Sequence, residues 1–169
     1  MVKKKNPNIH TISVYVANKP GVLVRCAQVF ARRGFNIDSL VVSPGVNPRY
    51  SRMTITAIGA PEVLEQIIKQ TGKLVDVLHC IEHTGLDSID REYAMLKIKA
   101  SGARARNAIK KRIKNCAHIL DDKNGAIIVG QMGTTEDLNK LEDQLKKKYT
   151  IIEMIRSGKL VMAVGKEPT

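Results

Sequence analysis

The chain has 169 residues, 43% of them apolar and 26% charged, which predicts one or two small folded domains with a substantial core. Lys and Arg number 28 against 16 Asp and Glu, so the net charge is +12. Aromatic residues make up only 4% of the chain and Trp is absent, which disfavours functions that depend on stacking many bases.

Cysteine usage and hydropathy indicate the compartment. The three cysteines, Cys26, Cys80 and Cys116, lie far apart, and no Cys-x-x-Cys pair is present. This pattern supports neither a disulfide framework nor a zinc ribbon. The basic residues 3–5 are not followed by an apolar segment, and no apolar stretch approaches the ~18 residues of a membrane span. We therefore expect a cytoplasmic protein without contact to a membrane.

The first half of the chain alternates strand and helix patterns. Residues 11–16 show the period of two that is typical of a half-buried strand. Asn18 is a candidate helix cap, Pro20 suits a first turn, and Gly34 ends the helix that follows. The remaining predicted elements of this half are a strand over 36–42, a strand over 51–58, a helix from 61 to 72 and a strand over 74–81.

The second half repeats this order. Its predicted elements are a strand over 92–100, a helix over 103–114, an extended segment over 118–120, a strand over 126–132, a helix capped by Thr135 and a strand over 151–155. Asn124-Gly125 is a hairpin signal. The segment 58–62 also reappears as 132–136, 74 positions later, which indicates a duplication or convergence on one architecture.

Two βαββαβ units follow from this order. The predicted fold class is α+β, with two ferredoxin-like domains, each an antiparallel sheet covered by helices on one face. We expect the domains to cover residues 1–84 and 85–169. Small sheets of this kind have exposed edges, so we expect at least a homodimer.

Catalytic and metal-binding motifs are weak. The chain has no Gly-x-Ser-x-Gly elbow and no phosphate-binding Gly-x-x-x-x-Gly-Lys-Ser/Thr loop. The densest group of metal-ligating residue types is 79–83, but on a strand His79 and His83 share one face while Cys80 points to the other. We predict no catalytic residue, no metal site and no cofactor.

The first junction between strand and helix, at residues 18–23, is the informative segment. A helix N-terminus offers free backbone N–H groups and a partial positive charge, which suit a carboxylate. Gly21 has no Cβ, so a ligand can approach the backbone, and Asn18 can accept from an ammonium group. Asn36 and Ile37 are expected to lie alongside. The pattern favours a small zwitterion with an aliphatic side chain, although a plain cap and turn would give the same residues.

Several segments resemble a known family. Residues 9–84 are similar to an ACT domain, a small amino-acid-binding module, and almost the whole chain resembles the regulatory small subunit of acetohydroxyacid (acetolactate) synthase. The resemblance is carried by segments 18–23, 30–40, 51–55, 64–70 and 73–77, and by Arg91-Glu92 and 155–158 in the second half. Arg-Arg-Gly-Phe-Asn-Ile followed by Ser-Arg-Met-Thr-Ile is a specific combination, whereas Pro-Gly alone is not.

The resemblance implies a function. It implies a non-catalytic partner that activates a thiamine-diphosphate-dependent catalytic subunit in valine, leucine and isoleucine biosynthesis. Feedback effectors of this family, usually valine, bind between the ACT domains of a dimer. The implied effector-binding residues are Asn18, Pro20, Gly21, Val22, Leu23, Asn36 and Ile37. The second half has Ala100-Ser101-Gly102-Ala103 at the corresponding junction, so no effector site is expected there.

Three alternatives remain open at this stage. A free-standing ACT-type sensor could control another enzyme, and an autonomous enzyme would need residues that the sequence does not display. The βαββαβ order also occurs in RNA-binding modules, which stack bases on aromatic residues of two central strands. Here the first strand offers Tyr15, but segment 51–58 offers no aromatic residue and the lysines are scattered. We therefore expect no binding to nucleic acid.

Overall fold

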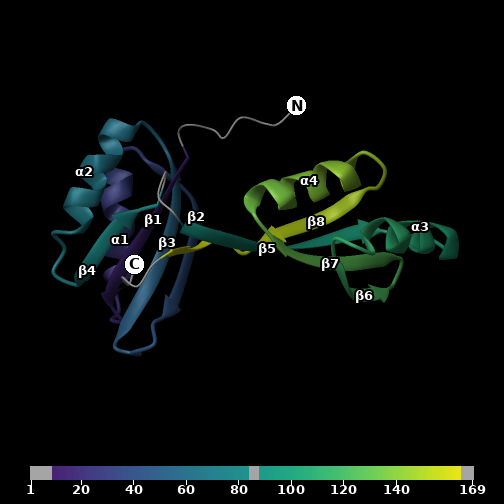
Figure 1. Ribbon diagram of the computed structural model, residues 1–169, viewed down its shortest axis with the longest axis horizontal. Coiled ribbons are helices and arrows are strands. Elements are labelled where there is room, and N and C mark those ends of the chain that lie inside the picture. Colours follow the sequence, from purple (N-terminus) through teal and green to yellow (C-terminus); the bar gives the residue numbers. More distant parts are fainter. Residues whose placement is uncertain (1–8, 84–87, 165–169) are drawn as a thin grey trace. The chain divides into compact units, whose positions relative to one another are not determined.

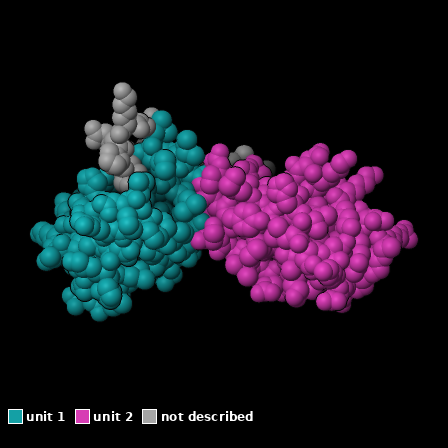
Figure 2. All heavy atoms as spheres, turned by 90° about the horizontal axis from the view of Figure 1, so that it is seen from below, with its two compact units in different colours: residues 1–90, 158–169 teal, residues 91–157 magenta. Residues whose placement is uncertain are grey.

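The structure is a computed structural model that describes residues 9–83 and 88–164 (Figure 1). The described chain forms two compact units (Figure 2): the first ends at Asp90 and resumes at Gly158, and the second spans Arg91–Ser157. The expected boundary at 84–85 lies outside the described residues. Residues 158–164 were expected in the second domain, but they group with the first unit. Within the described residues, no helix is long and apolar enough to cross a membrane.

The first unit has the predicted βαββαβ order. Its strands form one antiparallel sheet in the order β2-β3-β1-β4. The helices α1 and α2 lie on one side of this sheet (Figure 1). The bounds are β1 Ile9–Ala17, α1 Val22–Arg32, β2 Asn36–Pro44, β3 Tyr50–Ile58, α2 Pro61–Thr71 and β4 Val77–Glu82, with β9 Leu160–Ala163 at the end of the described chain.

The core of the first unit lies between the sheet and its two helices. On the sheet side, alternate residues of β1 face their cross-strand partners of β3, as in the pairs Ile12–Ile55 and Val14–Met53. Removing such side chains from water is worth about 1.5–3 kcal/mol for each large residue. The fully buried members of the core are Ile12, Val14, Val16, Val22, Cys26, Phe30, Met53, Ile55, Ala57, Leu64 and Ile67.

The other face of β1 is also buried, which the alternating pattern did not predict. Ser13 and its cross-strand partner Thr54 are both buried. The guanidinium of Arg52 lies on the same face, where Nη2 donates to Ser13 Oγ (3.0 Å) and to the Val161 carbonyl oxygen (2.7 Å). The segment containing β9 thus lies over this polar face. The prediction of a half-buried strand is wrong because the chain's own C-terminal segment covers the second face.

The second unit repeats the topology of the first. Its sheet has the order β6-β7-β5-β8, and β9 pairs with β5 outside this path. The bounds are β5 Ser88–Lys99, α3 Ala103–Ile113, β6 His118–Lys123, β7 Ala126–Gly133, α4 Thr135–Lys146 and β8 Ile151–Arg156. Its core is separate and contains Ala94, Leu96, Ile98, Ile109, Ile113, Ile127, Val129, Leu138, Leu141 and Leu145.

One local signal of the second unit is confirmed in detail, and a second is shifted by one residue. Asn124 and Gly125 both have positive φ, 52° and 77°, as the predicted turn between β6 and β7 requires. Thr134, one residue before the expected cap, is the N-cap of α4 and forms a capping box with Asp137. The matched segments 58–62 and 132–136 both join the third strand of their unit to its second helix.

Candidate functional site

Gly21 is the N-cap of α1 and has a φ of +83°. This left-handed conformation favours glycine, because other residues carry a Cβ that strains it. No side chain caps the helix, so the expected role of Asn18 as N-cap is wrong, and Pro20 precedes the helix. The first-turn amides of an α-helix have no partner within the helix, and they carry the positive end of its dipole.

Asn18 fixes the loop before the helix to the neighbouring hairpin. Its side-chain Nδ2 donates to the Pro48 carbonyl oxygen (3.0 Å), and its backbone N–H donates to the Arg49 carbonyl oxygen (2.8 Å). The amide nitrogen is therefore used within the chain. The amide oxygen is the atom that an ammonium group would need.

The two apolar residues of the predicted site differ in exposure. Val22 is 2% exposed and belongs to the core, so its side chain is not offered to a ligand, contrary to expectation. Leu23 is 40% exposed and Val24 is 57% exposed. Of the two apolar residues expected at the site in the first turn of α1, Leu23 is therefore the one whose side chain a ligand can reach.

Asn36 and Ile37 lie at the opposite end of the sheet from Gly21. Ala17, just before the loop, pairs with Tyr50, whereas Asn36 pairs with Ile58 at the other end of β3. These two ends are separated by about 27 Å at the usual strand rise. The expectation that Asn36 and Ile37 lie alongside Gly21 is therefore wrong within one chain, because β2 runs parallel to β1 and begins where α1 ends.

Arg25 is the charged neighbour of the loop that the sequence did not single out. An ideal Cβ built on Gly21 would lie 3.0 Å from Arg25 Nη1. The Arg25 guanidinium also forms an ion pair with the Asp76 carboxylate, and the Asp76 carbonyl oxygen accepts from the Ala17 N–H (2.8 Å). A guanidinium held in place thus adjoins the helix N-terminus, with its charge compensated by the Asp76 carboxylate.

The group of metal-ligating residue types at 79–83 is divided between the two faces of β4. Cys80 packs against the core, and burial raises the pKa of its thiol to about 12, so it is protonated at neutral pH. His83 lies on the other side, where its Nε2 is 2.9 Å from Ser13 Oγ. Within residues 9–83 and 88–164, no three His, Cys, Asp or Glu side chains gather as a metal site would require.

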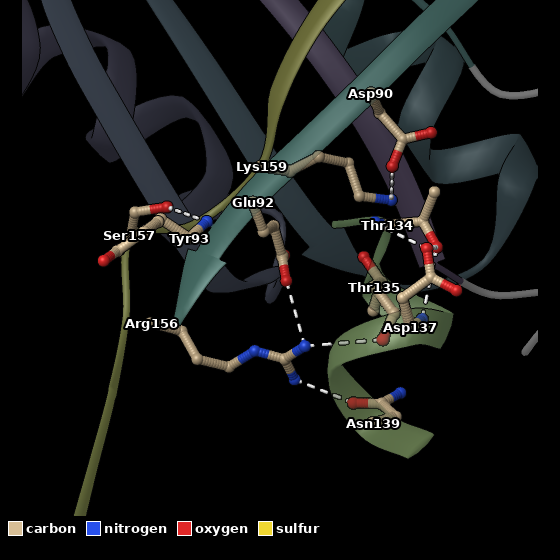
Figure 3. Close-up of polar contacts among 10 residues, drawn as sticks. All are labelled: Asp90, Glu92, Tyr93, Thr134, Thr135, Asp137, Asn139, Arg156, Ser157 and Lys159. Atoms are coloured by element: carbon tan, nitrogen blue, oxygen red, sulfur yellow. Dashed lines mark hydrogen bonds and ion pairs between the residues drawn. The ribbon is translucent and has the colours of Figure 1, made fainter. Parts of the chain in front are cut away.

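Arg156 organises a polar cluster in the second unit (Figure 3). Its guanidinium lies 3.1 Å from Glu92 Oε2 and donates to Asn139 Oδ1 (2.8 Å) and to the Thr135 carbonyl oxygen (3.4 Å). It therefore ties β5 and β8 to the first turn of α4. Both Glu92 and Arg156 belong to segments that carry the family resemblance, and the structure gives them a role in holding the unit together.

Family models match both halves of the chain. A model described as the ACT domain of the acetohydroxyacid synthase small subunit matches residues 12–79. A model described as the small subunit of acetolactate synthase matches residues 91–165. Together they span most of the chain.

Individual relatives agree with the family models. The chain is 37% identical over 156 residues to a probable acetolactate synthase small subunit of Archaeoglobus fulgidus, covering 92% of this chain and 97% of the relative. It is 35% identical over 158 residues to the acetolactate synthase small subunit of Haemophilus influenzae, covering 92% and 96%.

A solved structure confirms the fold. The crystal structure of the acetolactate synthase small subunit from Thermotoga maritima matches with a TM-score of 0.81 and 30% identity, covering 94% of this chain and 99% of that chain. The α+β class with two βαββαβ units is thereby confirmed. By its sequence in both halves and by its fold, the chain belongs to the family of acetolactate synthase small subunits.

Proposed function

We propose that this chain is the regulatory subunit of an acetolactate synthase. It has no active site of its own, binds the catalytic large subunit, raises its activity and makes it sensitive to a branched-chain amino acid, valine first. The observation that carries this proposal is the match of both units to the small-subunit family over nearly the full length of the chain and of its relatives. The ACT role belongs to the first unit.

The effector would bind at the loop before α1. The first-turn amides favour a carboxylate, and the Arg25 guanidinium lies beside Gly21, where an effector carboxylate could share it with Asp76. Leu23 offers an exposed aliphatic surface, and the Asn18 amide oxygen is available to an ammonium group. Pro20 shapes the approach to the loop. These features match the two charged ends and the side chain of a small aliphatic amino acid.

A second copy would complete this site. Strand β2 is an edge of the first sheet, and an antiparallel pair of β2 edges related by a two-fold axis reverses the direction of the partner's strand. The start of the partner's β2 then lies at the end of the sheet where Gly21 lies. In this dimer, Asn36 and Ile37 of one copy contribute to the effector site of the other.

The size of the effector limits the strength of regulation. Valine has about eight heavy atoms, and small ligands gain at most ~1.5 kcal/mol for each. A micromolar to millimolar dissociation constant is therefore expected. Allosteric coupling free energies of ~1–3 kcal/mol correspond to about 5- to 150-fold changes in affinity, so we expect a graded effect on activity.

Reconstitution tests the proposal. The purified chain is added to its cognate large subunit, acetolactate formation from pyruvate is measured, and valine, leucine and isoleucine are titrated in turn. We expect activation by the chain and a response to at least one of the three. Failure of the chain to bind the large subunit would contradict the proposal and favour a sensor for another enzyme, while turnover of pyruvate by the chain alone would show an autonomous enzyme.

A further inference from the structure

The sheet of the second unit has one face that its helices do not cover. Alternate residues of β5, namely Ala94, Leu96 and Ile98, face the core beneath α3 and α4. The residues between them lie on the opposite face of the sheet. Their cross-strand partners lie on that face too, because directly paired residues share a face. We call this the outer face; its centre is formed by Tyr93, Met95, Leu120, Ile128, Gly130, Met132 and Ile155.

The register places these side chains next to one another. Met95 pairs with Gly130 on β7 and with Ile155 on β8, and Tyr93 pairs with Met132. An ideal Cβ on Gly130 would lie 2.0 Å from the Tyr93 hydroxyl oxygen and 3.0 Å from Leu120 Cδ1, so both side chains cover this glycine. The apolar residues therefore form one continuous surface across four strands.

This surface is exposed and apolar where a solvated face would be polar. Five of its side chains are exposed, from 37% for Tyr93 and Met95 to 67% for Met132, whereas Ile128 is half-buried and Gly130 is buried. Antiparallel sheets with one solvated face normally carry polar residues on it. The first unit shows the reverse arrangement: its second face carries Ser13 and Thr54, and residues of its own chain cover it. A contiguous exposed apolar surface of this kind marks an interaction site.

Charge indicates which partner fits. Lys99 and Lys123 flank Ala126 at one end of the outer face. Further along, Lys97 pairs with Glu153, and Asp121 pairs with Ile128, so the face carries both signs and its unpaired lysines gather at the Ala126 end. The second unit as a whole has fifteen Lys and Arg against eight Asp and Glu. Two copies joined through this face would bring two such positive units together, which is unfavourable. A partner with carboxylates around an apolar centre is complementary in both respects.

Nucleic acid fits this face less well. Sheets that bind RNA in this way place aromatic residues on their two central strands. Here β5 contributes Tyr93, whereas β7 contributes Ile128, Gly130 and Met132.

We propose that the outer face of the second unit is a docking surface for the catalytic large subunit, through a patch of that subunit that is apolar at its centre and acidic at its rim. This inference rests on the proposed function, and it assigns a separate surface to the second unit while the first unit binds the effector. Burial of Met95, Met132 and Ile155 would supply the free energy, and the lysines would steer the encounter.

Met132→Glu tests the surface. The substitution places a carboxylate in the apolar centre, opposite an acidic rim, and the high exposure of Met132 means that the folded unit tolerates it. Ala108→Glu is the matched control, because Ala108 is exposed on α3, on the other side of the sheet. We expect Met132→Glu to weaken the binding of the large subunit at least tenfold in calorimetry, Ala108→Glu to stay within twofold of wild type, and added salt to weaken wild-type binding.

The outcomes separate this inference from the proposed function. If wild type and Met132→Glu bind the large subunit equally well, the docking surface is refuted while the proposed function stands. If wild type does not bind the large subunit, both are refuted. If Met132→Glu instead lowers the oligomeric state of the isolated chain, measured by light scattering, the outer face joins two copies. Tight binding of RNA that Met132→Glu abolishes would also overturn the proposal.

Discussion

Gly21 meets a demand of the backbone and, in the proposed effector site, a demand of the ligand as well. Its positive φ disfavours other residues, and its missing Cβ lets the Arg25 guanidinium lie against the loop, with Nη1 3.0 Å from where a Cβ would stand. Gly21→Asp should place a carboxylate where the effector carboxylate would bind, at a cost in stability of about 1–2 kcal/mol for the left-handed conformation. We expect effector binding, measured by calorimetry, to weaken at least tenfold, while binding of the large subunit is retained.

Gly125→Asp is the control for Gly21→Asp. Gly125 also has a positive φ, 77°, and a Cβ added there would meet no atom within 4 Å. It lies in the turn between β6 and β7 of the second unit and should show the same loss of stability with unchanged effector binding. Effector affinity of Gly21→Asp equal to that of wild type would move the site away from this loop.

We expect His83 to make the stability of the first unit depend on pH. It is only 4% exposed, and burial together with the nearby Arg52 guanidinium lowers its pKa below the ordinary value of 6.5. Below pH 6.5 the unfolded chain binds a proton at this residue that the folded chain does not bind. The free energy of unfolding should therefore fall as the pH decreases from 6.5 towards the folded-state pKa.

Urea unfolding at a series of pH values checks this expectation. His83→Gln keeps a polar group near Ser13 Oγ but cannot bind the proton, so its stability should depend less steeply on pH below 6.5 than that of wild type. The same dependence in both proteins would show that His83 contributes nothing to it.

Single residues were predictable from sequence where a local rule fixes them. Gly21 and the turn at Asn124-Gly125 follow from backbone conformation alone. Arg25 and Arg52 were not singled out, because their roles depend on partners distant in sequence, Asp76 and the Val161 carbonyl oxygen. Arginine on a helix or strand is normally a surface residue, and the sequence holds no signal that distinguishes these two.

At the scale of elements, the two units differ at one pair of equivalent helix starts. Thr134 caps α4 with its side chain, and the Asp137 carboxylate accepts a hydrogen bond from the Thr134 N–H (3.2 Å). Ala60, which is 74 positions earlier, caps α2 in a similar extended conformation without any side-chain hydrogen bond. The two equivalent helix starts therefore share one backbone geometry at the N-cap, but only the N-cap of α4 has a side-chain acceptor.

Removing the side-chain cap of α4 and adding one to α2 should change the free energy of unfolding in opposite directions. Thr134→Ala removes the acceptor for the Asp137 N–H and should lower the free energy of unfolding by about 1 kcal/mol. Ala60→Asp supplies a carboxylate to the uncapped start of α2 and should raise it by about 0.5–1 kcal/mol. Denaturant unfolding followed by circular dichroism measures both, and shifts of the same sign would contradict this account.

Most elements were predictable from sequence, and the exceptions have one cause. Periodicity and turn residues located all four helices and the eight strands of the two repeats. Strand β9 and the start of β5, at residues 88–91, were missed, because β9 pairs with β5 outside the βαββαβ repeat and residues 88–91 precede it. A pattern read within one βαββαβ unit contains no information about a strand added from outside it.

At the scale of the whole molecule, the predicted site divides into two parts. The residues from 18 to 23 lie at one end of the sheet, and Asn36 and Ile37 lie at the other. The family resemblance implied both parts, but their separation within one chain appears only in the strand register. Because β1 and β2 are parallel, the two parts would come together in the proposed dimer, where the partner's β2 runs in the opposite direction.

Mixed dimers provide a decisive test of this arrangement. In a dimer of Gly21→Asp copies, and in a dimer of Asn36→Ala copies, each effector site contains one altered residue, so both should bind the effector poorly. In a mixed dimer with one copy of each variant, one site contains both altered residues and the other contains neither. We expect calorimetry of the mixed dimer to show one site per dimer with wild-type affinity. A site built within one chain would leave an altered residue in both sites, and the mixed dimer would then bind no better than its parents.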